Sequence, residues 1–260
     1  MSVRTYMEAV AEVAREAGDA ALTFYGTNVA VDSKADGSPV TAADRSAEQL
    51  ARKWISSRFP SDGIVGEEFG IEGSDRARKW IIDPIDGTKS FVRGVPLWGT
   101  LVAVVEDQTV LAGAAYFPAL GDIVFAGAGE GCWWNDRRCS VSEVSSLTEA
   151  AILTSAPIDE SPFGERWADL TRRAPIVRTW GDCYGYFLVA TGRAEVMVDP
   201  RLSSWDIAAF IPIITEAGGV ITDLEGKSPI DGGSAVATNA ALAREVRTIL
   251  DVPTAAEVTR

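Results

Sequence analysis

The sequence predicts an α/β protein with an α+β N-terminal half and an α/β C-terminal half. Three observations support this fold class. Apolar residues recur at helical spacing near the N-terminus, strand-like apolar runs dominate residues 64–134, and strands then alternate with helices along the rest of the chain. With 260 residues, the chain can bury a sizeable core in one large domain or two small ones.

Two amphipathic helices are predicted first. Apolar residues follow a helical period over residues 3–25, and Gly26 ends this pattern. Thr41 and Asp44 resemble a capping box, although Glu is commoner than Asp at the second position. A second helix is therefore expected to begin at this box, with an apolar face that extends to Phe59.

Strands are predicted for the middle of the chain. Short apolar runs at 64–66 and 79–82 favour buried strands. Two hairpins are expected after them, because each pair of apolar runs is separated by a short turn. The paired runs are 97–105 with 109–116, and 123–128 with 132–134.

The polar stretch 142–148 is the best candidate for a domain boundary. It separates an expected N-terminal α+β domain, residues 1–145, from an expected C-terminal α/β domain, residues 146–260. Strands are predicted beyond it at 152–154, 176–179, 194–198 and 219–222. Helices are predicted at 162–171, 184–190, 205–217 and 240–250. Pro212 is expected to kink the third of these helices.

The composition restricts the partners of this protein. No apolar run approaches the ~20 residues that a membrane helix needs, and residues 1–15 are typical of an amphipathic helix rather than a signal peptide. A cytoplasmic location is therefore expected. The net charge of -13 opposes binding to nucleic acid and to anionic membranes. An anionic phosphate ester would need cations beside it, and bound Mg²⁺ would supply them.

Histidine is absent from the chain, and the three cysteines lack CxxC spacing. The absence of histidine excludes His-based catalytic triads, His general bases and ordinary zinc sites. We interpret Cys132, Cys139 and Cys183 as reduced thiols that serve as packing residues. Any hydrolysis must therefore use carboxylates, hydroxyls and metal-bound water.

The most informative motif is Asp83-Pro84-Ile85-Asp86-Gly87-Thr88. It follows the predicted strand 79–82, and its proline is expected to direct the chain into a rigid turn. Its last two residues would present free backbone amides at a helix start, which suits an anion. Two carboxylates beside such a start indicate a Mg²⁺-assisted phosphoryl site. The alternative is an Asx-type turn with a helix cap.

Two other carboxylates have a comparable context. Glu67 follows the predicted strand 64–66, and Asp206 lies in the first turn of the predicted helix 205–217. Ligands bind outside the carboxyl ends of strands in open α/β sheets, so distant carboxylates can converge there. The alternatives are a solvated loop for Glu67 and a helix-dipole partner for Asp206.

These motifs resemble the signature of the inositol monophosphatase family, a group of Mg²⁺-dependent, lithium-sensitive phosphatases. The matching segments are Val40-Thr41-Ala42-Ala43-Asp44, Gly66-Glu67-Glu68, Asp83 to Thr88, and Trp205-Asp206-Ile207-Ala208. The resemblance extends from about Val31 to Gly219. It implies a layered α-β-α-β-α sandwich, a homodimer, inhibition by Li⁺ and a small-molecule phosphate monoester as substrate.

The same resemblance implies a metal site with two to three Mg²⁺ ions. Glu67, Asp83 and the carbonyl of Ile85 are expected to hold the first ion. Asp83, Asp86 and Asp206 are expected to hold the second, and Glu67 also touches a third, weaker ion. Oxygen ligands of this kind are the ones that Mg²⁺ prefers.

The resemblance also implies the residues that act on the phosphate and the water. The amides of Gly87 and Thr88 are expected to bind phosphate. Thr88 and Asp44 are expected to orient the attacking water, so that Glu67, Asp44 and Thr88 form the catalytic set. No covalent enzyme intermediate is required.

Two further segments resemble the histidinol-phosphate phosphatase branch of this family, of actinobacterial type. They are Ser90 to Trp98 and Trp180 to Tyr186. Inositol phosphatases tend to carry a small hydroxyl residue where Asp182 stands and Glu where Asp199 stands. We expect these two aspartates to bind substrate; the alternative is that Asp182 caps the helix that follows it.

The resemblance thus implies hydrolysis of L-histidinol phosphate in histidine biosynthesis. Inositol-1-phosphate phosphatase is the alternative of the same class, and a nucleotide or bisphosphate phosphatase comes third. A catalytically silent metal-binding scaffold is the alternative of another class. The intact set of Glu67, Asp83, Asp86, Thr88 and Asp206 argues against such a scaffold.

Overall fold

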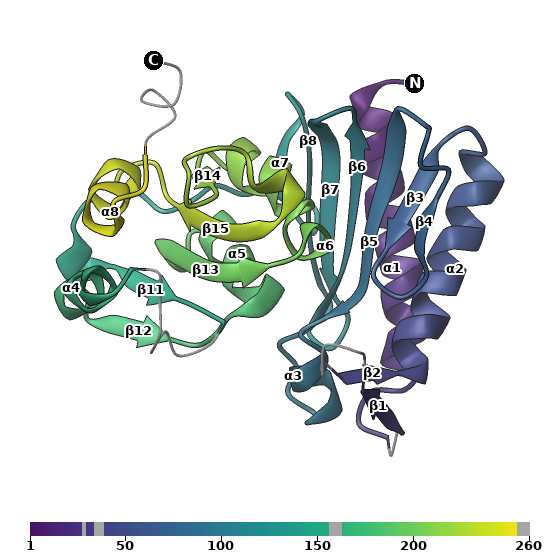
Figure 1. The fold of residues 1–260 in the computed structure, drawn as a ribbon, viewed down its shortest axis with the longest axis horizontal. Helices are drawn as coiled ribbons and strands as arrows, with labels where there is room; N and C mark the ends of the chain where they lie inside the picture. The colour runs from purple at the N-terminus through teal and green to yellow at the C-terminus, as the bar shows by residue number, and fades with distance from the viewer. Residues whose placement is uncertain (28–29, 34–38, 156–162, 254–260) are drawn as a thin grey trace.

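The computed structural model describes residues 1–27, 30–33, 39–155 and 163–253. Their helices and strands form five layers (Figure 1). An outer pair of helices covers an eight-stranded sheet, a central helical layer separates this sheet from a five-stranded sheet, and a second pair of helices lies outermost. This arrangement confirms the predicted α/β fold class and the layered α-β-α-β-α sandwich.

The first helical layer contains α1 (Val3–Leu22) and α2 (Ala42–Arg58), close to the predicted bounds. Three alanines of α1, Ala14, Ala17 and Ala21, are fully buried, and small side chains let the helix lie close to the sheet. The predicted capping box of α2 is present at Thr41 and Asp44. None of the helices in the described ranges is long and apolar enough to cross a membrane.

The large sheet has the strand order β10-β9-β8-β7-β6-β5-β3-β4, in which only β3 and β5 are parallel neighbours. Its strands are β3 (Gly63–Gly66), β4 (Gly70–Glu72), β5 (Arg78–Asp86), β6 (Gly99–Glu106), β7 (Thr109–Phe117), β8 (Asp122–Gly127), β9 (Gly131–Trp134) and β10 (Arg137–Arg138). Both predicted hairpins are confirmed. A separate two-stranded sheet joins β1 (Val31–Ser33) and β2 (Pro39–Thr41).

Strand β5 is longer than predicted. The expected strand 79–82 ended before the proline, whereas β5 continues through Pro84 to Asp86. The register with β6 shifts between Asp83 and Asp86, and the Pro84 carbonyl accepts a hydrogen bond from Thr100 Oγ1 at 2.8 Å. An irregularity of this kind accommodates a residue that has no N–H to donate to the ladder.

The smaller sheet has the order β12-β11-β13-β15-β14. In it β11 (Ala151–Leu153) pairs in parallel with β12 (Ile176–Arg178) and β13 (Val196–Leu202). Strand β15 (Gly233–Thr238) lies antiparallel between β13 and β14 (Val220–Thr222). The sequence pattern did not predict β15, because Gly, Ser and Ala give it a weak strand signal.

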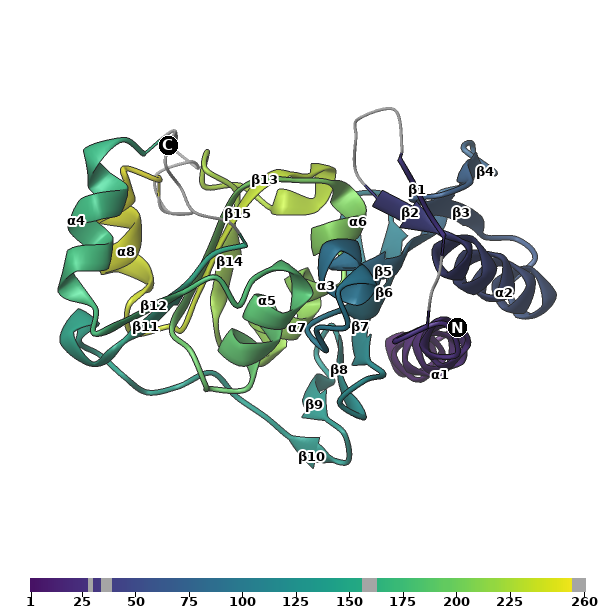
Figure 2. The same ribbon diagram turned by 90° about the horizontal axis from the view of Figure 1, so that it is seen from below.

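Helices α4 (Glu165–Arg173) and α8 (Ala243–Leu250) contact each other on the outer face of the smaller sheet (Figure 2). The helix predicted at 162–171 begins at Glu165 instead. Residue 162 lies outside the described residues. Two short 3₁₀ helices, η1 (Leu147–Glu149) and η2 (Pro229–Asp231), complete this half.

The central layer contains α5 (Asp182–Ala190), α6 (Ser204–Ile207) and α7 (Phe210–Glu216). The single helix predicted at 205–217 is thus divided into α6 and α7. The expected kink at Pro212 was wrong in position, because the interruption precedes the proline and leaves it in the first turn of α7, where a missing N–H is tolerated.

One hydrophobic cluster joins the central layer to both sheets. It includes Leu101 and Ala115 of the large sheet, Phe187 of α5, Met197 of β13 and Ile213 of α7. The central helices are therefore held between two apolar surfaces, and this packing fixes α6 beside β5. The division into domains 1–145 and 146–260 stays a prediction.

Candidate active site

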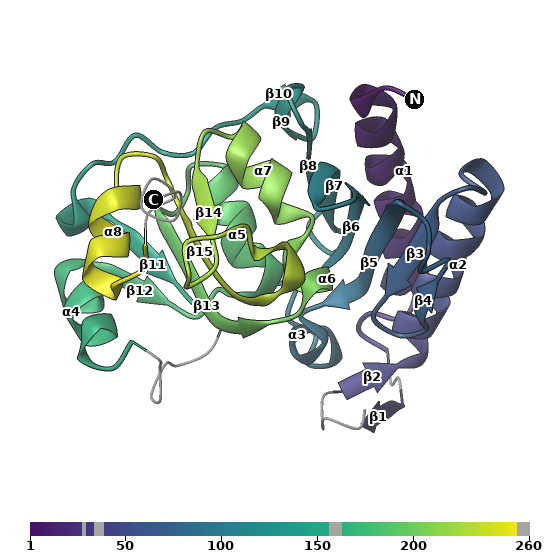
Figure 3. The same cartoon turned by 45° about the horizontal axis from the view of Figure 1, so that its top comes forward.

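Three aspartates from two distant parts of the chain meet at one place. Asp83 and Asp86 belong to β5, and Asp206 belongs to α6, which lies beside β5 (Figure 3). One carboxylate oxygen from each lies within 4.8 Å of the others, and we call this set the acidic cluster. Oxygens at such separations can surround one divalent cation, because Mg²⁺ and Ca²⁺ bind oxygen at about 2.0–2.6 Å.

Burial and repulsion from neighbouring carboxylates raise the pKa of two members of this cluster, Asp83 and Asp86. Burial is the largest cause for Asp83, and the charges of Glu67, Asp86 and Asp206 raise its pKa further. For Asp86, burial is again the largest cause, and Asp182 and Asp206 add to the effect. A bound cation would remove this penalty, so the donor set fits a divalent metal ion.

Local hydrogen bonds fix the cluster in place. Asp83 Oδ1 accepts the Ile85 amide at 3.0 Å, so the Asx turn considered as an alternative is present within the cluster. The Cys183 amide, at the start of α5, donates to Asp86 Oδ2. Asp206 accepts the Ser203 amide at 2.6 Å and completes a capping box on α6. The contact between Cys183 and Asp86 was not predictable from the sequence, because the two residues are 97 positions apart.

Glu67 lies at the end of β3, where its amide donates to the Ile82 carbonyl at 3.2 Å. Its side chain is close enough to Asp83 to raise the pKa of that carboxyl through a hydrogen bond and through charge. A strand, a carboxylate and then a helix were expected at Glu67, as at Asp83 and Asp86, but the residue is followed by a turn into β4. Glu67 therefore adjoins the acidic cluster from the neighbouring strand of the same sheet.

The turn after Glu67 is held by a buried glutamate that sequence reasoning missed. Glu48 of α2 accepts the amides of Glu68 at 2.7 Å and Phe69 at 3.2 Å, and Arg52 Nε donates to it at 2.8 Å. A Cβ on Gly66 would lie 1.9 Å from Glu48 Oε1, so only glycine permits this approach. In the sequence, Glu48 and Arg52 look like an ordinary surface ion pair on a helix.

Asp44 has one satisfied and one unsatisfied oxygen. Its Oδ2 accepts the amide and the hydroxyl of Thr41, both at 2.7 Å. Its Oδ1 is buried and has no hydrogen-bond partner among the described residues. Burial, as the largest cause, raises the pKa of Asp44 to about 6. A buried acceptor of this kind is suited to a water molecule that donates to it.

The motif ends in a short helix, α3 (Thr88–Val92), with Gly87 at its N-cap. The φ of Gly87 is 82°, a left-handed conformation that favours glycine. Thr88 Oγ1 donates to the Ile85 carbonyl at 2.9 Å, so two of the predicted site residues are in direct contact. The hydroxyl of Thr88 is therefore fixed against the turn that carries Asp83 and Asp86.

Asp182 is the first residue of α5 and has a φ of 50°. Gly181 occupies the N-cap position without a side-chain hydrogen bond, so the alternative that Asp182 caps this helix is wrong. A Cβ on Gly87 would lie 3.4 Å from Asp182 Oδ2, which places this carboxylate against the start of α3. Asp182 is thus beside the predicted phosphate-binding residues.

Asp199 is a buried neighbour of Asp182. Its two oxygens accept the Ser155 amide at 3.2 Å and the Tyr186 hydroxyl at 2.9 Å. Ser155 also accepts the Asp182 amide at 2.8 Å and thereby connects the two aspartates. The pKa of Asp182 is raised to about 6; burial is the largest cause, the charges of Asp199 and Asp206 contribute, and Lys89 opposes the shift.

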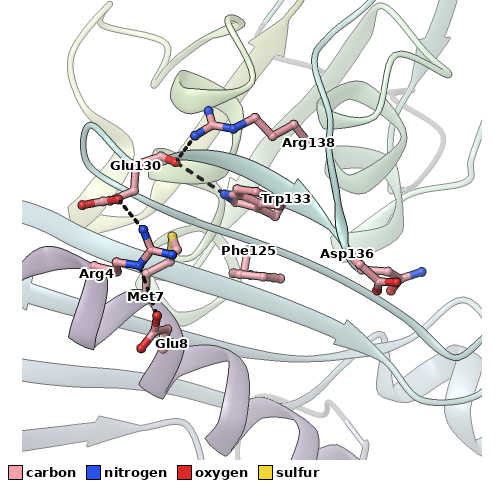
Figure 4. Close-up of a pocket in the computed structure, with 9 residues that line it drawn as sticks. Arg4, Met7, Glu8, Phe125, Glu130, Trp133, Asp136 and Arg138 are labelled. Atoms are coloured by element: carbon pink, nitrogen blue, oxygen red, sulfur yellow. Dashed lines mark hydrogen bonds and ion pairs between the residues drawn. The ribbon is translucent and has the colours of Figure 1, made fainter.

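A separate pocket lies between α1 and the β8–β9 hairpin (Figure 4). Its volume is about 270 Å³, and its floor contains Met7, Phe125 and Trp133. At its rim Arg4 pairs with Glu8 at 3.3 Å and with Glu130 at 4.0 Å. None of the predicted site residues lines this pocket, so it is not the candidate active site.

The layered fold brings three carboxylates together at the carboxyl end of β5, and this arrangement is typical of metal-dependent phosphatases. The profile of the inositol monophosphatase family matches residues 3–251. The chain belongs to the inositol monophosphatase family, and it is a phosphoric monoester hydrolase.

Relatives and solved structures agree with this assignment. A histidinol-phosphatase of Chlorobaculum parvum is 44% identical over 90% of this chain and 92% of its own, and one of Mycobacterium tuberculosis is 41% identical over 88% and 90%. An inositol-1-monophosphatase of Mesorhizobium japonicum is 31% identical over 98% and 100%. A Thermotoga maritima IMPase structure covers 92% of this chain and 94% of its own, with a TM-score of 0.83 and 32% identity.

Proposed function

We propose that this protein hydrolyses L-histidinol phosphate to L-histidinol and phosphate in histidine biosynthesis. The observation that carries the proposal is the position of Asp182, which lies next to Asp86 and Asp206 of the acidic cluster and next to the start of α3, with Asp199 beside it. Histidinol phosphate carries an ammonium beyond its phosphate, whereas inositol phosphate carries only hydroxyls there. Two carboxylates outside the metal ligands favour the cationic substrate. The histidinol-phosphatases among the relatives support the same choice.

Mg²⁺ is the proposed cofactor, with two to three ions per site. Glu67, Asp83 and the Ile85 carbonyl would hold the first ion, and Asp83, Asp86 and Asp206 the second; Glu67 would also touch a third. Bound Mg²⁺ neutralises phosphate charge and activates water. Inhibition by Li⁺ is expected, as in the family that the motifs resemble.

The remaining site residues act on the phosphate and the water. We assign phosphate binding to the amides of Gly87 and Thr88, beside the positive end of α3. Thr88 and Asp44 orient the attacking water. The Oδ1 of Asp44 supports this role, because it is buried without a hydrogen-bond partner among the described residues and can accept a hydrogen bond from water.

We also propose a homodimer in the cytoplasm that binds neither nucleic acid nor membranes, and a division into domains 1–145 and 146–260. The family resemblance supports the dimer, and the net charge of -13 supports the exclusion of polyanionic partners.

The test of the proposed function compares two substrates at saturating Mg²⁺. We expect a higher kcat/KM for L-histidinol phosphate than for inositol 1-phosphate, measured by phosphate release. Better turnover of inositol 1-phosphate would replace the proposed substrate and leave the phosphatase assignment intact. No phosphate release from either substrate would support a silent scaffold.

The first prediction concerns substrate choice by charge. Asp182→Asn and Asp199→Asn should each weaken turnover of histidinol phosphate. Both variants should keep their turnover of a phosphomonoester whose alcohol part is uncharged, such as inositol 1-phosphate. An ammonium ~4 Å from a carboxylate gains about 1 kcal/mol in water and about 4 kcal/mol at the effective dielectric of a protein surface. This range corresponds to roughly one to three decades in kcat/KM. Asparagine keeps the side-chain shape and tolerates the left-handed φ of Asp182.

The pH profile gives an independent check of Asp182. Its pKa is raised to about 6, so the carboxyl gains its charge as the pH rises through about 6. The preference for histidinol phosphate should therefore increase between pH 5 and pH 7 in the wild type, and Asp182→Asn should flatten this increase. Equal losses on both substrates at every pH would mean that Asp182 serves the shared phosphate site.

The second prediction concerns Glu48, which positions the turn that carries Glu67. Glu48→Gln should raise the Mg²⁺ requirement about tenfold, because residues that orient metal ligands typically contribute 10–100-fold to metal affinity. We expect kcat at saturating Mg²⁺ to change much less. Calorimetric titration with Mn²⁺ measures the affinity independently of turnover.

A matched control exists on the same helix. Arg58 of α2 pairs with Glu12 of α1 at 2.5 Å and is partly exposed. Arg58→Met should leave the metal affinity unchanged, since this pair does not contact the turn after β3. An unaltered Mn²⁺ affinity in Glu48→Gln would show that Glu48 serves the fold alone.

A further inference from the structure

We propose that Cys132 and Cys139 form a redox-active dithiol that reacts with small-molecule disulfides and closes to an intramolecular disulfide. The two cysteines lie opposite each other in the β9–β10 hairpin. Trp134 pairs with Arg137 and Trp133 with Arg138, so Cys132 and Cys139 are the next facing pair. The Cys139 amide donates to the Cys132 carbonyl at 3.1 Å, and the two sulfur atoms are 3.4 Å apart.

The hairpin separates the cysteines from the pocket described above. Trp133 and Arg138 line that pocket, as Figure 4 shows, and alternate residues of a strand point to opposite faces. Cys132 and Cys139 are therefore on the face that Trp134 shares, toward α5. There Trp134 packs edge-on against Phe187, with ring centroids 5.8 Å apart.

The two thiols have different surroundings, which assigns the order of reaction. Cys132 is 1% exposed, whereas Cys139 is only partly buried. The hydrogen bond between the two thiols is the main cause that lowers the pKa of Cys139, and the Arg193 guanidinium lowers it further. The pKa of Cys132 is raised by the same hydrogen bond and by burial. Cys139 is thus the attacking thiolate and Cys132 the resolving thiol.

Arg193 is held where it can stabilise this thiolate. Its guanidinium lies over the rings of Trp134 and Phe187, with its carbon 4.6 and 4.4 Å from their centroids. Glu216 of α7 accepts hydrogen bonds from the amides of Gly129 and Gly131, both at 2.8 Å. Its negative charge raises the pKa of Cys132. Both charges therefore favour ionisation of Cys139 over Cys132.

The reaction balances as a thiol–disulfide exchange. The Cys139 thiolate attacks one sulfur of the small disulfide, whose S–S bond breaks, and the departing thiolate takes up a proton. Cys132 then loses its proton and attacks Cys139 Sγ, which forms the protein disulfide and expels the second thiol. The protein gives up two electrons and two protons, and one small disulfide becomes two thiols.

The test treats the folded, Mg²⁺-loaded enzyme with glutathione disulfide and quenches it with acid before mass spectrometry. We expect the wild type to lose two hydrogens and to yield a disulfide-linked 132–139 segment. Cys132→Ser should instead retain one glutathione on Cys139, and Cys139→Ser should remain unmodified. Cys183 is an internal control, because it is buried and has no neighbouring cysteine among the described residues, so it should not react in the native state.

Three outcomes would overturn the proposal. The first is a wild type that stays unmodified, and the second is a wild type that keeps a stable glutathione adduct without forming the Cys132–Cys139 disulfide. The third is a Cys139→Ser variant that is modified as much as the wild type. Since neither cysteine belongs to the proposed site, phosphatase activity verifies that each serine variant is folded. A loss of activity in both variants would be resolved by Cys→Ala versions, which keep the small size of the side chain.

Discussion

Asp83→Asn is expected to remove nearly all phosphatase activity while the protein stays folded. Asp83 is proposed to hold both Mg²⁺ ions, so the substitution removes an anionic ligand that the two share. Asparagine keeps an oxygen that can accept the Ile85 amide, so the Asx turn should persist. The measurements are kcat/KM over a range of Mg²⁺ concentrations and the thermal unfolding temperature.

Asp62 provides a matched control for this variant. It is also a buried aspartate near β5, where it accepts the Trp80 indole N–H at 3.1 Å, but it lies outside the acidic cluster. Asp62→Asn should keep its activity. Retained turnover in folded Asp83→Asn at saturating Mg²⁺ would refute the metal assignment, as would an enzyme that is insensitive to a chelator.

Thr88→Ala is expected to reduce kcat by ~10²–10⁴-fold, the usual contribution of a group that moves a proton in the transition state. The Thr88 hydroxyl is held by its hydrogen bond to the Ile85 carbonyl, and its proposed role is to orient the attacking water with Asp44. The Mg²⁺ requirement should change far less than kcat, because the carboxylates remain. Kinetics at several fixed Mg²⁺ concentrations separate the two effects.

Thr88→Ser is the conservative partner of this variant. It keeps the hydroxyl and removes only a methyl group, so most of the activity should return. If Thr88→Ala alters only the Mg²⁺ requirement, then Thr88 helps to hold the metal and its proposed role in water activation is wrong.

Local patterns in the sequence predicted much of the fold and pointed to the three aspartates that the structure brings together. The capping box at Thr41 and Asp44, the two hairpins and the N-terminal helices depend on residues close together in the chain, and all were confirmed. Asp83 and Asp86 were recognisable because their motif is contiguous. Their convergence with Asp206 followed from the rule that ligands gather at strand ends in α/β sheets.

Features that depend on distant contacts were not predictable from these patterns. Strand β15 consists of small residues, and its position between β13 and β14 determines its structure. Glu48 looks like half of a surface ion pair, and only the approach of the turn after β3 reveals its role. In each case the deciding partner lies in another element.

The acidic cluster also has a consequence for folding. Its carboxylates come from β5 and from α6, so it forms only after the central helices have docked against the large sheet. Contacts between residues so far apart in the chain form slowly, because closing the intervening loop costs conformational entropy. Recovery of activity during refolding should therefore lag behind the return of secondary structure. Mg²⁺ should accelerate this last phase, since it relieves the repulsion that opposes docking.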